Sequence, residues 1–303
     1  VYLTRVISMM ITVTLVTALA FAGPDRAPRG VCVAFAGPDR RTRGAGVRMA
    51  ASAADLHGVQ AACLEKVQAA FTLTERDFPN SLECAAWSSG PSSGAVRGFA
   101  AEPKLGWISS SITNSGRGVC ASELTAFVAP AFDIPHLYQV VGLTPEGKIS
   151  LTLDYIARYD LPADQNYLQD YFLSTTEWQE KLRTSVAGVA ESAVRQDVYM
   201  RTIRSPMQLC LELENTADSL AALKAACESN VDRWIGWWQT AKEVNRMKVG
   251  SIFMRDTKIH RMRFQSHAGL LKASGVPAEL AERVAQAIVG PGDEQYVGLG
   301  DGA

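Results

Sequence analysis

Short β-prone runs separated by turn signals dominate the middle of the chain, at 95–100, 106–113, 119–128, 136–143 and 149–156. Glycine, proline or an Asn-Ser-Gly turn lies between successive runs. Connections this short permit antiparallel pairing and leave no room for the crossover helix that parallel strands need. The centre of the protein is therefore predicted to be an antiparallel sheet.

Helical patterns flank this sheet on both sides in the sequence. Apolar spacing of three and four predicts an amphipathic helix over 53–74, and a Pro-, Ser- and Gly-rich stretch predicts a loop over 79–94. Further helices are expected at 162–172, 175–189, 216–249, 256–273 and 277–288, and Asn215 is the expected cap of the helix at 216–249. One more strand is expected at 208–213. The expected fold class is α/β, a three-layer α/β/α sandwich with a central antiparallel sheet, in one domain over 50–303.

The first fifty residues differ from the rest in charge and composition. Residues 1–49 hold seven arginines, two aspartates and no lysine, a net charge of +5 in a chain whose formal net charge is −1. An uncharged apolar run at 6–20 ends in Ala-Leu-Ala, as in a signal peptide, and AFAGPDR occurs at both 20–26 and 34–40. This segment resembles the bipartite plastid presequences of algae with secondary plastids. We expect a disordered targeting segment over 1–49 that is removed, and a mature protein in the chloroplast stroma; the alternative is a secretory signal followed by a linker.

Several classes of function lack their sequence signature. The balanced charge provides no basic field for nucleic acid, and no segment is long and apolar enough to suggest an integral membrane protein. P-loop, dinucleotide-binding, zincin and nucleophile-elbow motifs are absent. The six cysteines form no CxxC and no Cys/His pair at metal-ligand spacing, so no metal site is expected. An enzyme of this sequence would work with side-chain acids or with a partner's cofactor.

Two groups of polar residues stand out by their spacing. On the strand at 136–143, His136 and Tyr138 share one face, whereas Gln139 lies on the other. Asp256 and His260 are four residues apart, so a helix that begins at Asp256 would place the carboxyl where it orients the imidazole or donates a proton. Ordinary sheet hydrogen bonds for the first group, and a helix-capping aspartate for the second, are the alternatives.

A third polar group, Tyr199, Arg201 and Arg204, precedes the strand at 208–213. Its two cations and its ring could hold the carboxylates of an acidic, aromatic ligand, or could be surface residues. Tryptophans at 234, 237 and 238 follow helical spacing and indicate either core packing or a homodimer contact.

These phrases, in this order, resemble the red chlorophyll catabolite reductases, plastid enzymes related to the ferredoxin-dependent bilin reductases. The resemblance runs from about 109 to 298. It rests on IPHLYQVV, on ISLTLDYIARYDL followed by NYLQDYF, on VYMRTIRSP before QLCLELE, and on FMRDTKIHR.

The resemblance implies an open-chain tetrapyrrole bound between the sheet and the C-terminal helices. It implies that no flavin, nicotinamide or metal is bound, because reduced ferredoxin supplies single electrons from outside. The step implied is reduction of a methine-bridge double bond of red chlorophyll catabolite, which gives the primary fluorescent catabolite. A bilin reductase for chromophore synthesis and a non-catalytic tetrapyrrole-binding protein remain alternatives.

The resemblance also implies roles for individual residues. Asp256 matches an acidic residue near a substrate propionate, a candidate proton donor whose pKa burial would raise. Gln139 stands where relatives have a glutamate, which would leave proton delivery to Asp256 or His260. Tyr199 matches an aromatic position that helps to select the protonated face of the pigment.

The remaining assignments concern binding. His136, Tyr138, Arg201, Arg204 and Arg255 are expected to bind substrate together with Tyr199. Ferredoxin is acidic, so we expect it to dock on the densest group of cations, which are Lys242, Arg246, Lys248, Lys258 and Arg261, with Arg255 and Arg263 beside them.

Overall fold

The computed structural model describes residues 51–76, 86–115, 118–185, 190–191 and 198–290. The expected targeting segment, 1–49, lies outside the described residues. The described part belongs to one compact unit, Val47–Ala303.

The described residues form a nine-stranded antiparallel sheet in the order β1-β3-β4-β5-β6-β7-β9-β8, with β2 paired to β3. The strands are β1 (Thr74–Glu75), β2 (Trp87–Ser89), β3 (Ser92–Ala101), β4 (Leu105–Asn114), β5 (Cys120–Val128), β6 (His136–Leu143), β7 (Ile149–Ile156), β8 (Ala190–Glu191) and β9 (Leu209–Leu213). The predicted runs at the centre of the chain and the strand at 208–213 are confirmed, each within a few residues.

The expected loop over 79–94 is wrong in its second half, because β2 and β3 form a tight hairpin there. Ser89 pairs with Ser92, so the turn consists of Gly90 and Pro91 alone. Gly90 has φ 55, a left-handed conformation that glycine adopts without strain. The serine- and glycine-rich composition correctly predicts a turn at this point. Residues of the same composition also form the ends of β2 and β3 on either side of the turn.

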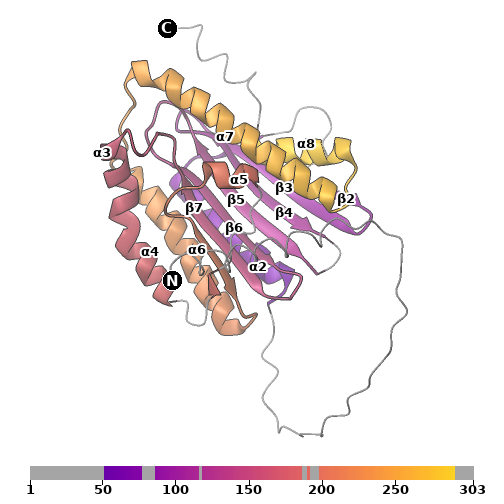
Figure 1. Ribbon diagram of the computed structural model, residues 1–303. Helices are drawn as coiled ribbons and strands as arrows, with labels where there is room; N and C mark the ends of the chain where they lie inside the picture. Colours follow the sequence, from indigo (N-terminus) through magenta and orange to yellow (C-terminus); the bar gives the residue numbers. More distant parts are fainter. Residues whose placement is uncertain (1–50, 77–85, 116–117, 186–189, 192–197, 291–303) are drawn as a thin grey trace, which may run out of the picture. The chain divides into compact units, whose positions relative to one another are not determined.

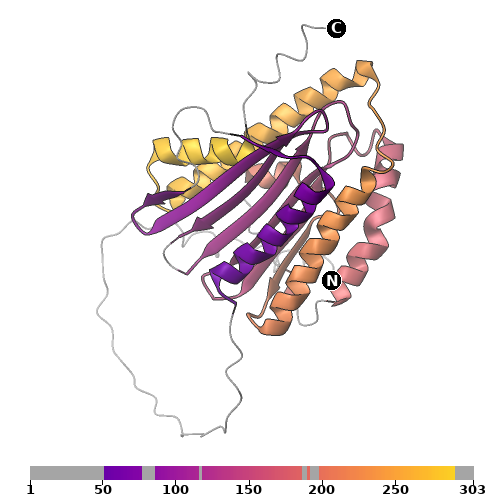
Figure 2. The ribbon, with the colours of Figure 1, turned by 180° about the vertical axis from the view of Figure 1, so that it is seen from behind.

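One face of the sheet is covered by two long helices, α2 (Ala53–Ala70) and α6 (Ala217–Trp237) (Figure 2). Both helices bury apolar residues against the sheet, and together they enclose the larger hydrophobic core. The cap of α6 is Thr216, whose hydroxyl accepts from the backbone N–H of Ser219. Asn215, the predicted cap, instead bonds the backbone of Ala51 and ties α2 to α6.

The other face is covered by α7 (Arg246–Ala273), α8 (Ala278–Val289) and the short α5 (Val198–Ile203) (Figure 1). Helix α8 packs on β3 and β4, and α5 lies against α7. With helices on both faces of an antiparallel sheet, the expected three-layer sandwich is confirmed.

The segment that follows β7 is less regular than predicted. The helix expected at 162–172 is a single turn, α3 (Gln165–Tyr167), followed by a π-helical turn, η1 (Leu168–Phe172). A 3-10 turn, η2 (Leu173–Thr175), leads into α4 (Thr176–Ser185). Residues 186–189 of the predicted helix lie outside the described residues.

The long helix predicted over 216–249 is wrong, because α6 ends at Trp237 and α7 begins only at Arg246. Between them the chain bonds an earlier loop: Val244 donates to the carbonyl of Ala131 at 2.8 Å. The side chain of Asn245 then caps α7 by accepting from the N–H of Met247. Helical propensity alone does not reveal this pairing between distant segments.

The tryptophan cluster belongs to the core. Trp234 is fully buried, and its Nε1–H donates to the carbonyl of Pro135 at 3.0 Å. Trp237 and Trp238 are half-buried and pack edge-on against aromatic rings of the same core, including Tyr155 and Phe71. In the described part of the chain, no helix is long and apolar enough to cross a membrane.

Candidate functional site

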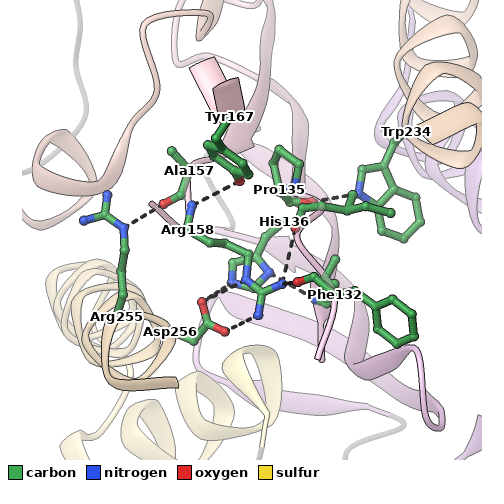
Figure 3. A network of polar contacts seen from close by, with 11 residues as sticks. Phe132, Pro135, His136, Ala157, Arg158, Tyr167, Trp234, Arg255 and Asp256 are labelled. Carbon is green, nitrogen blue, oxygen red and sulfur yellow. Dashed lines mark hydrogen bonds and ion pairs between the residues drawn. The ribbon is translucent and has the colours of Figure 1, made fainter. Parts of the chain in front are cut away.

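Asp256 lies inside α7, with its carboxylate turned toward the sheet (Figure 3). Its Oδ1 is 3.0 Å from Nε2 of His136, at the start of β6. Arg158, which follows β7, donates from Nε to Oδ1 at 3.1 Å and from Nη2 to Oδ2 at 2.5 Å. All three residues are buried. The position of Asp256 ten residues into the helix excludes the capping role considered from the sequence.

Arg158 completes this cluster and was not singled out from the sequence. Its Nη1 donates to the carbonyl of Phe132 at 2.7 Å and to that of Ile134 at 3.4 Å, which fixes the guanidinium independently of Asp256 (Figure 3). A signal existed, because Arg158 lies two residues beyond a buried strand, and an arginine that is buried needs a partner. The sequence does not say which of the many acidic residues provides it.

His136 is held as one tautomer. The backbone N–H of Val128 donates to Nδ1 at 3.0 Å, so Nδ1 carries no proton and Nε2–H points at Asp256. Burial lowers the pKa of His136 to about 4, although the charge of Asp256 opposes the shift. His136 is therefore a neutral hydrogen-bond donor at physiological pH.

The expectation that burial raises the pKa of Asp256 is wrong. Burial acts in that direction, but the charge of Arg158 and then the contact with His136 outweigh it and lower the pKa of Asp256 to about 2. In this arrangement Asp256 is a buried anion without a proton to donate, and it anchors α7 to β6 and to the end of β7.

His260 lies one turn beyond Asp256 on α7. Its ring stacks on that of Phe127, with centroids 3.9 Å apart and planes inclined by 28°. Burial and the nearby His136 lower the pKa of His260 to about 3, against the effect of a hydrogen bond to the backbone of Val289. Asp256 and His260 lie four residues apart on one helix, as predicted. With its pKa lowered to about 3, His260 carries no proton to donate at neutral pH beyond that of its neutral ring.

A pocket of about 500 Å³ opens farther along α7, between the sheet and the three helices of this face. Strands β4 to β7 and β9 form its floor, and Met200 of α5 and the last turns of α7 form its roof. This volume is typical of small-molecule sites. Of the residues assigned to the site from the sequence, Tyr138 alone lines this pocket; Asp256 and His260 do not.

A second buried carboxylate, Glu123 of β5, lies on the wall of this pocket. Arg263 of α7 donates to its Oε1, Thr125 also donates to Oε1 at 3.0 Å, and His267 places Nε2 3.5 Å from the same oxygen. Burial raises the pKa of Glu123, but the charges of His267 and Arg263 outweigh it and lower that pKa to about 2. The sequence-based choice missed Glu123, although a glutamate in a strand that is otherwise mostly apolar is a signal of the same kind as Arg158.

Asp154 of β7 is the third buried carboxyl on this face, opposite Tyr138 in the register. Burial raises the pKa of Asp154 to about 7, although hydrogen bonds from Ser205 oppose the shift. The Ser205 hydroxyl donates to Oδ1 at 2.5 Å and Gln208 donates to Oδ2 at 3.3 Å. Asp154 lies next to the pocket without lining it.

Gln139 does not belong to this site, which corrects the expectation from the sequence. Its side chain points to the opposite face, where Nε2 donates to Oε1 of Gln60 in α2 at 2.8 Å and Oε1 accepts from Asn230 in α6 at 3.2 Å. The period of two along β6 places Gln139 away from His136 and Tyr138. Gln139 therefore holds α2 and α6 on the sheet. The residues on either side of it in β6, Tyr138 and Val140, line the pocket on the opposite face.

Tyr199 and Arg201 of α5, and Arg204 just after it, do not line the pocket, although they were expected to bind substrate. Tyr199 is 38% exposed, and Arg201 and Arg204 are exposed as well. The residue of this segment that lines the pocket is Met200, one position later than predicted. The surface alternative for the two arginines is confirmed, because both side chains are exposed and neither lines the pocket.

Arg255 lies beside the Asp256 cluster. Its Nε donates to the carbonyl of Ala157 at 2.9 Å, so it fastens α7 to the chain just before Arg158 (Figure 3). Arg255 does not line the pocket.

Five of the cations expected to dock a partner are exposed: Lys242, Arg246, Lys248, Lys258 and Arg261. Lys242 is 3.7 Å from Asp170 and Lys248 is 3.4 Å from Asp164, so acids partly offset these two charges. Arg263, grouped with them by sequence, is buried and belongs to the Glu123 cluster instead. Within the described ranges, no group of three or more His, Cys, Asp or Glu side chains is arranged to hold a metal ion.

Comparison with models of protein families identifies the family of this chain. Residues 105–288 match the model of the red chlorophyll catabolite reductase (RCC reductase) family. The chain belongs to this family. Membership makes the protein an oxidoreductase that acts on a tetrapyrrole. No curated protein sequence matches the chain significantly.

Solved structures share the fold. Selenomethionine-labelled phytochromobilin synthase from tomato, solved in complex with biliverdin, is 15% identical, with a TM-score of 0.60 over 80% of this chain and 87% of its own. A structure of PcyX is 11% identical, with a TM-score of 0.46 over 75% of this chain and 93% of its own. The likeness to the tomato protein shows that both chains fold as the same sandwich.

Proposed function

We propose that this protein reduces red chlorophyll catabolite to the primary fluorescent chlorophyll catabolite, with electrons from reduced ferredoxin. The reaction adds two electrons and two protons across a methine-bridge double bond of an open-chain tetrapyrrole. The family gives the reaction class, and its name supplies the substrate that we propose.

The observation that carries this proposal is the pocket between the sheet and α5, α7 and α8. It holds about 500 Å³, enough for much of an elongated pigment, and combines apolar side chains such as Val140 and Leu270 with several hydroxyls. Glu123 and His267 add ionisable groups to one wall. An apolar pocket with few polar groups suits a large conjugated ligand that must also receive protons.

The electron donor that we propose is an external ferredoxin, so the protein needs no bound redox group. On the side of α7 that faces away from the sheet, Met247 is 91% exposed and Met254 is 55% exposed. Arg246 precedes Met247, and Lys258 and Arg261, both exposed, follow Met254 by about one and two turns of the same helix. Exposed apolar side chains with cations before and after them on the same helix suit a transient complex with an acidic protein.

This docking surface lies across α7 from the helix face that covers the sheet. A helix with its side chains is about 10–12 Å across. The pocket is lined by residues 266–274 of the same helix, so an iron–sulfur protein bound over residues 254–261 would lie across α7 from the sheet and roughly 10–25 Å from the pocket along the helix axis.

We also propose that the protein works in the plastid. The support is the sequence of residues 1–49, with its apolar run, the repeated AFAGPDR and the excess of arginine. Fusion of these residues to a fluorescent protein in an alga with secondary plastids tests this location; retention in the secretory pathway would contradict it.

An anaerobic assay tests the reaction. The protein is mixed with red chlorophyll catabolite or with biliverdin and a ferredoxin-reducing system, and absorbance and blue fluorescence are followed. We expect blue fluorescence with the chlorophyll catabolite, dependent on ferredoxin.

Two other outcomes would replace this proposal. Reduction of biliverdin alone would make the protein a bilin reductase. A shifted pigment spectrum without reduction of either compound would make it a tetrapyrrole-binding protein. The position of Gln139 on the opposite face removes the sequence argument for that last alternative.

A further inference from the structure

We propose that His267 donates a proton to the pigment during its reduction, and that Glu123 positions the imidazole for this step. The inference rests on the proposed reductase function and assigns its proton donor. His267 lies near the end of α7 and lines the pocket, eleven residues beyond Asp256.

The geometry of His267 gives its two nitrogens different surroundings. Nε2 is enclosed by the protein and lies 3.5 Å from Oε1 of Glu123. Since the ring also forms part of the pocket wall, Nδ1 is the nitrogen that can face a bound ligand. A histidine backed by a carboxylate and open on its other side is the usual arrangement of a general acid or base.

Glu123 is well fixed for this role. Arg263 and Thr125 bond the same carboxylate, and the guanidinium of Arg263 stacks 5.0 Å from the ring of Phe127 and 5.4 Å from that of Tyr138. The pKa of Glu123, lowered to about 2 by His267 and Arg263 against the effect of burial, keeps it ionised. Glu123 is thus a permanent anion that orients His267 and compensates the positive charge of its protonated form.

Four other titratable groups in or near the pocket are poorer donors. Burial raises the pKa of Tyr138 well above its ordinary value, and it also raises the pKa of Cys120, so both keep their protons. Asp154 is bonded to Ser205 and does not line the pocket. Asp256 is ionised and also lies outside the pocket wall.

The proposed step balances in charge and atoms. One electron from reduced ferredoxin converts the pigment to its radical anion. The Nδ1–H bond of the imidazolium then breaks, a C–H bond forms at a carbon of the reducing double bond, and His267 becomes neutral. Solvent reprotonates the ring, whose side chain is 14% exposed, and a second electron and a second proton complete the reduction.

The test compares His267→Ala and His267→Gln with His57→Gln, a histidine change in α2 on the other face of the sheet. We expect both His267 variants to bind biliverdin within about threefold of the wild type and to lose roughly 100-fold or more in kcat, the usual contribution of a general acid. Under single turnover they should accumulate the pigment radical, seen by electron paramagnetic resonance. Added imidazole should restore reduction in His267→Ala, which a purely structural role would not allow.

Glu123 is tested separately as a positioning residue. We expect Glu123→Gln to lower kcat by about tenfold with an unchanged KM for the pigment, and imidazole not to restore it. If this variant fails to fold, because Arg263 loses its partner, the His267 variants still decide the proposal.

The outcomes separate this inference from the function on which it rests. If the wild type reduces a pigment and His267→Ala keeps kcat within threefold, the inference is overturned and the function stands. If the wild type reduces neither pigment, the function is overturned. In that case the absorption spectrum of bound biliverdin decides the inference. If His267 donates a proton, biliverdin is protonated when bound to the wild type and unprotonated when bound to His267→Ala; identical spectra would overturn the inference.

Discussion

At the scale of single residues, the buried charges on the α7 face show how much a partner changes the effect of burial. Asp154 and Asp256 are both buried carboxyls close to the same sheet face, yet the pKa of Asp154 is raised to about 7 and that of Asp256 is lowered to about 2. Burial acts to raise the pKa of both carboxyls, but only Asp256 has an arginine, Arg158, beside it. The partner therefore decides which carboxyl is protonated at neutral pH.

Removing the partner of Asp256 should destabilise the protein strongly. We expect Arg158→Met to lower the free energy of unfolding by about 3–5 kcal/mol, because it leaves a buried anion with only His136 as a partner. Urea unfolding measures this difference. Arg97→Met is the control, since its pair with Glu75 is exposed and should contribute less than about 1 kcal/mol. Equal losses in the two variants would contradict this account of the cluster.

Asp154 should give the stability a distinct pH dependence. Its pKa is about 7 in the folded protein and about 3.9 when unfolded, so the folded state binds more protons in between. This contribution is complete below about pH 4 and is lost as the pH rises to 7, by up to about 1.4 kcal/mol per pH unit. His136 and His260, with lowered pKa values, act in the opposite direction.

The effect of Asp154 is therefore measured as a difference. We expect the stability of Asp154→Asn relative to the wild type to increase between pH 4.5 and 7 in urea unfolding, because asparagine has no proton to lose. Stability curves that stay parallel over this range would show that Asp154 titrates normally in the folded protein.

At the scale of elements, alternation along β6 gives its two faces different tasks. Tyr138 lines the pocket under α7, whereas Gln139 joins α2 to α6 through Gln60 and Asn230. Helix α5 shows the same division, with Met200 inside and Tyr199 outside. An alignment that is displaced by one position along a strand thus moves a residue to the opposite layer of the protein.

Gln139→Glu tests this assignment. A glutamate there would be a buried anion among two amides, so we expect a loss of several kcal/mol in stability and no gain in turnover. Gln139→Met, which removes the polar atoms, should cost about 1–3 kcal/mol through the unpaired Gln60 and Asn230. An increase in pigment reduction by Gln139→Glu would show that the residue reaches the substrate after all.

At the scale of the whole described unit, α7 separates two functional surfaces. Its sheet side carries Asp256, His260, Arg263 and His267 in successive turns, and its outer side carries the methionines and cations of the proposed docking surface. The proposed docking surface spans residues 246–261 of α7, whereas the pocket is lined by residues 266–274 of the same helix.

Charge reversal on this outer side should weaken ferredoxin binding. We expect Lys258→Glu combined with Arg261→Glu to raise the KM for ferredoxin by about tenfold at low salt and by much less at about 0.5 M salt, where exposed charges are screened. Steady-state reduction at several ferredoxin concentrations measures this effect. Lys224→Glu, on α6 at the other face, is the matched control and should change little. Equal effects at low and high salt would exclude this surface as the docking site.

The sequence by itself determined the local part of this structure. Short β-prone runs and their turns marked β3 to β7, alternation marked β9, helical patterns marked α2, α8 and the part of α7 from residue 256 onward, and ordered phrases such as FMRDTKIHR indicated the family. These properties depend on neighbours within a few residues, and local patterning records them. The same locality explains why Asp256 and His260 fall on one helix as predicted.

Only the tertiary structure decided which charges meet. Arg158 is 98 residues from Asp256, and Glu123 is 140 residues from Arg263, so no spacing rule connects them. Packing α7 across the sheet creates both pairs, lowers the pKa of Asp256 instead of raising it, and places His267 on the pocket wall. The pKa of a buried group depends on the charges that the fold brings within a few ångströms of it. Distances between residues that are far apart in the sequence cannot be read from the sequence alone.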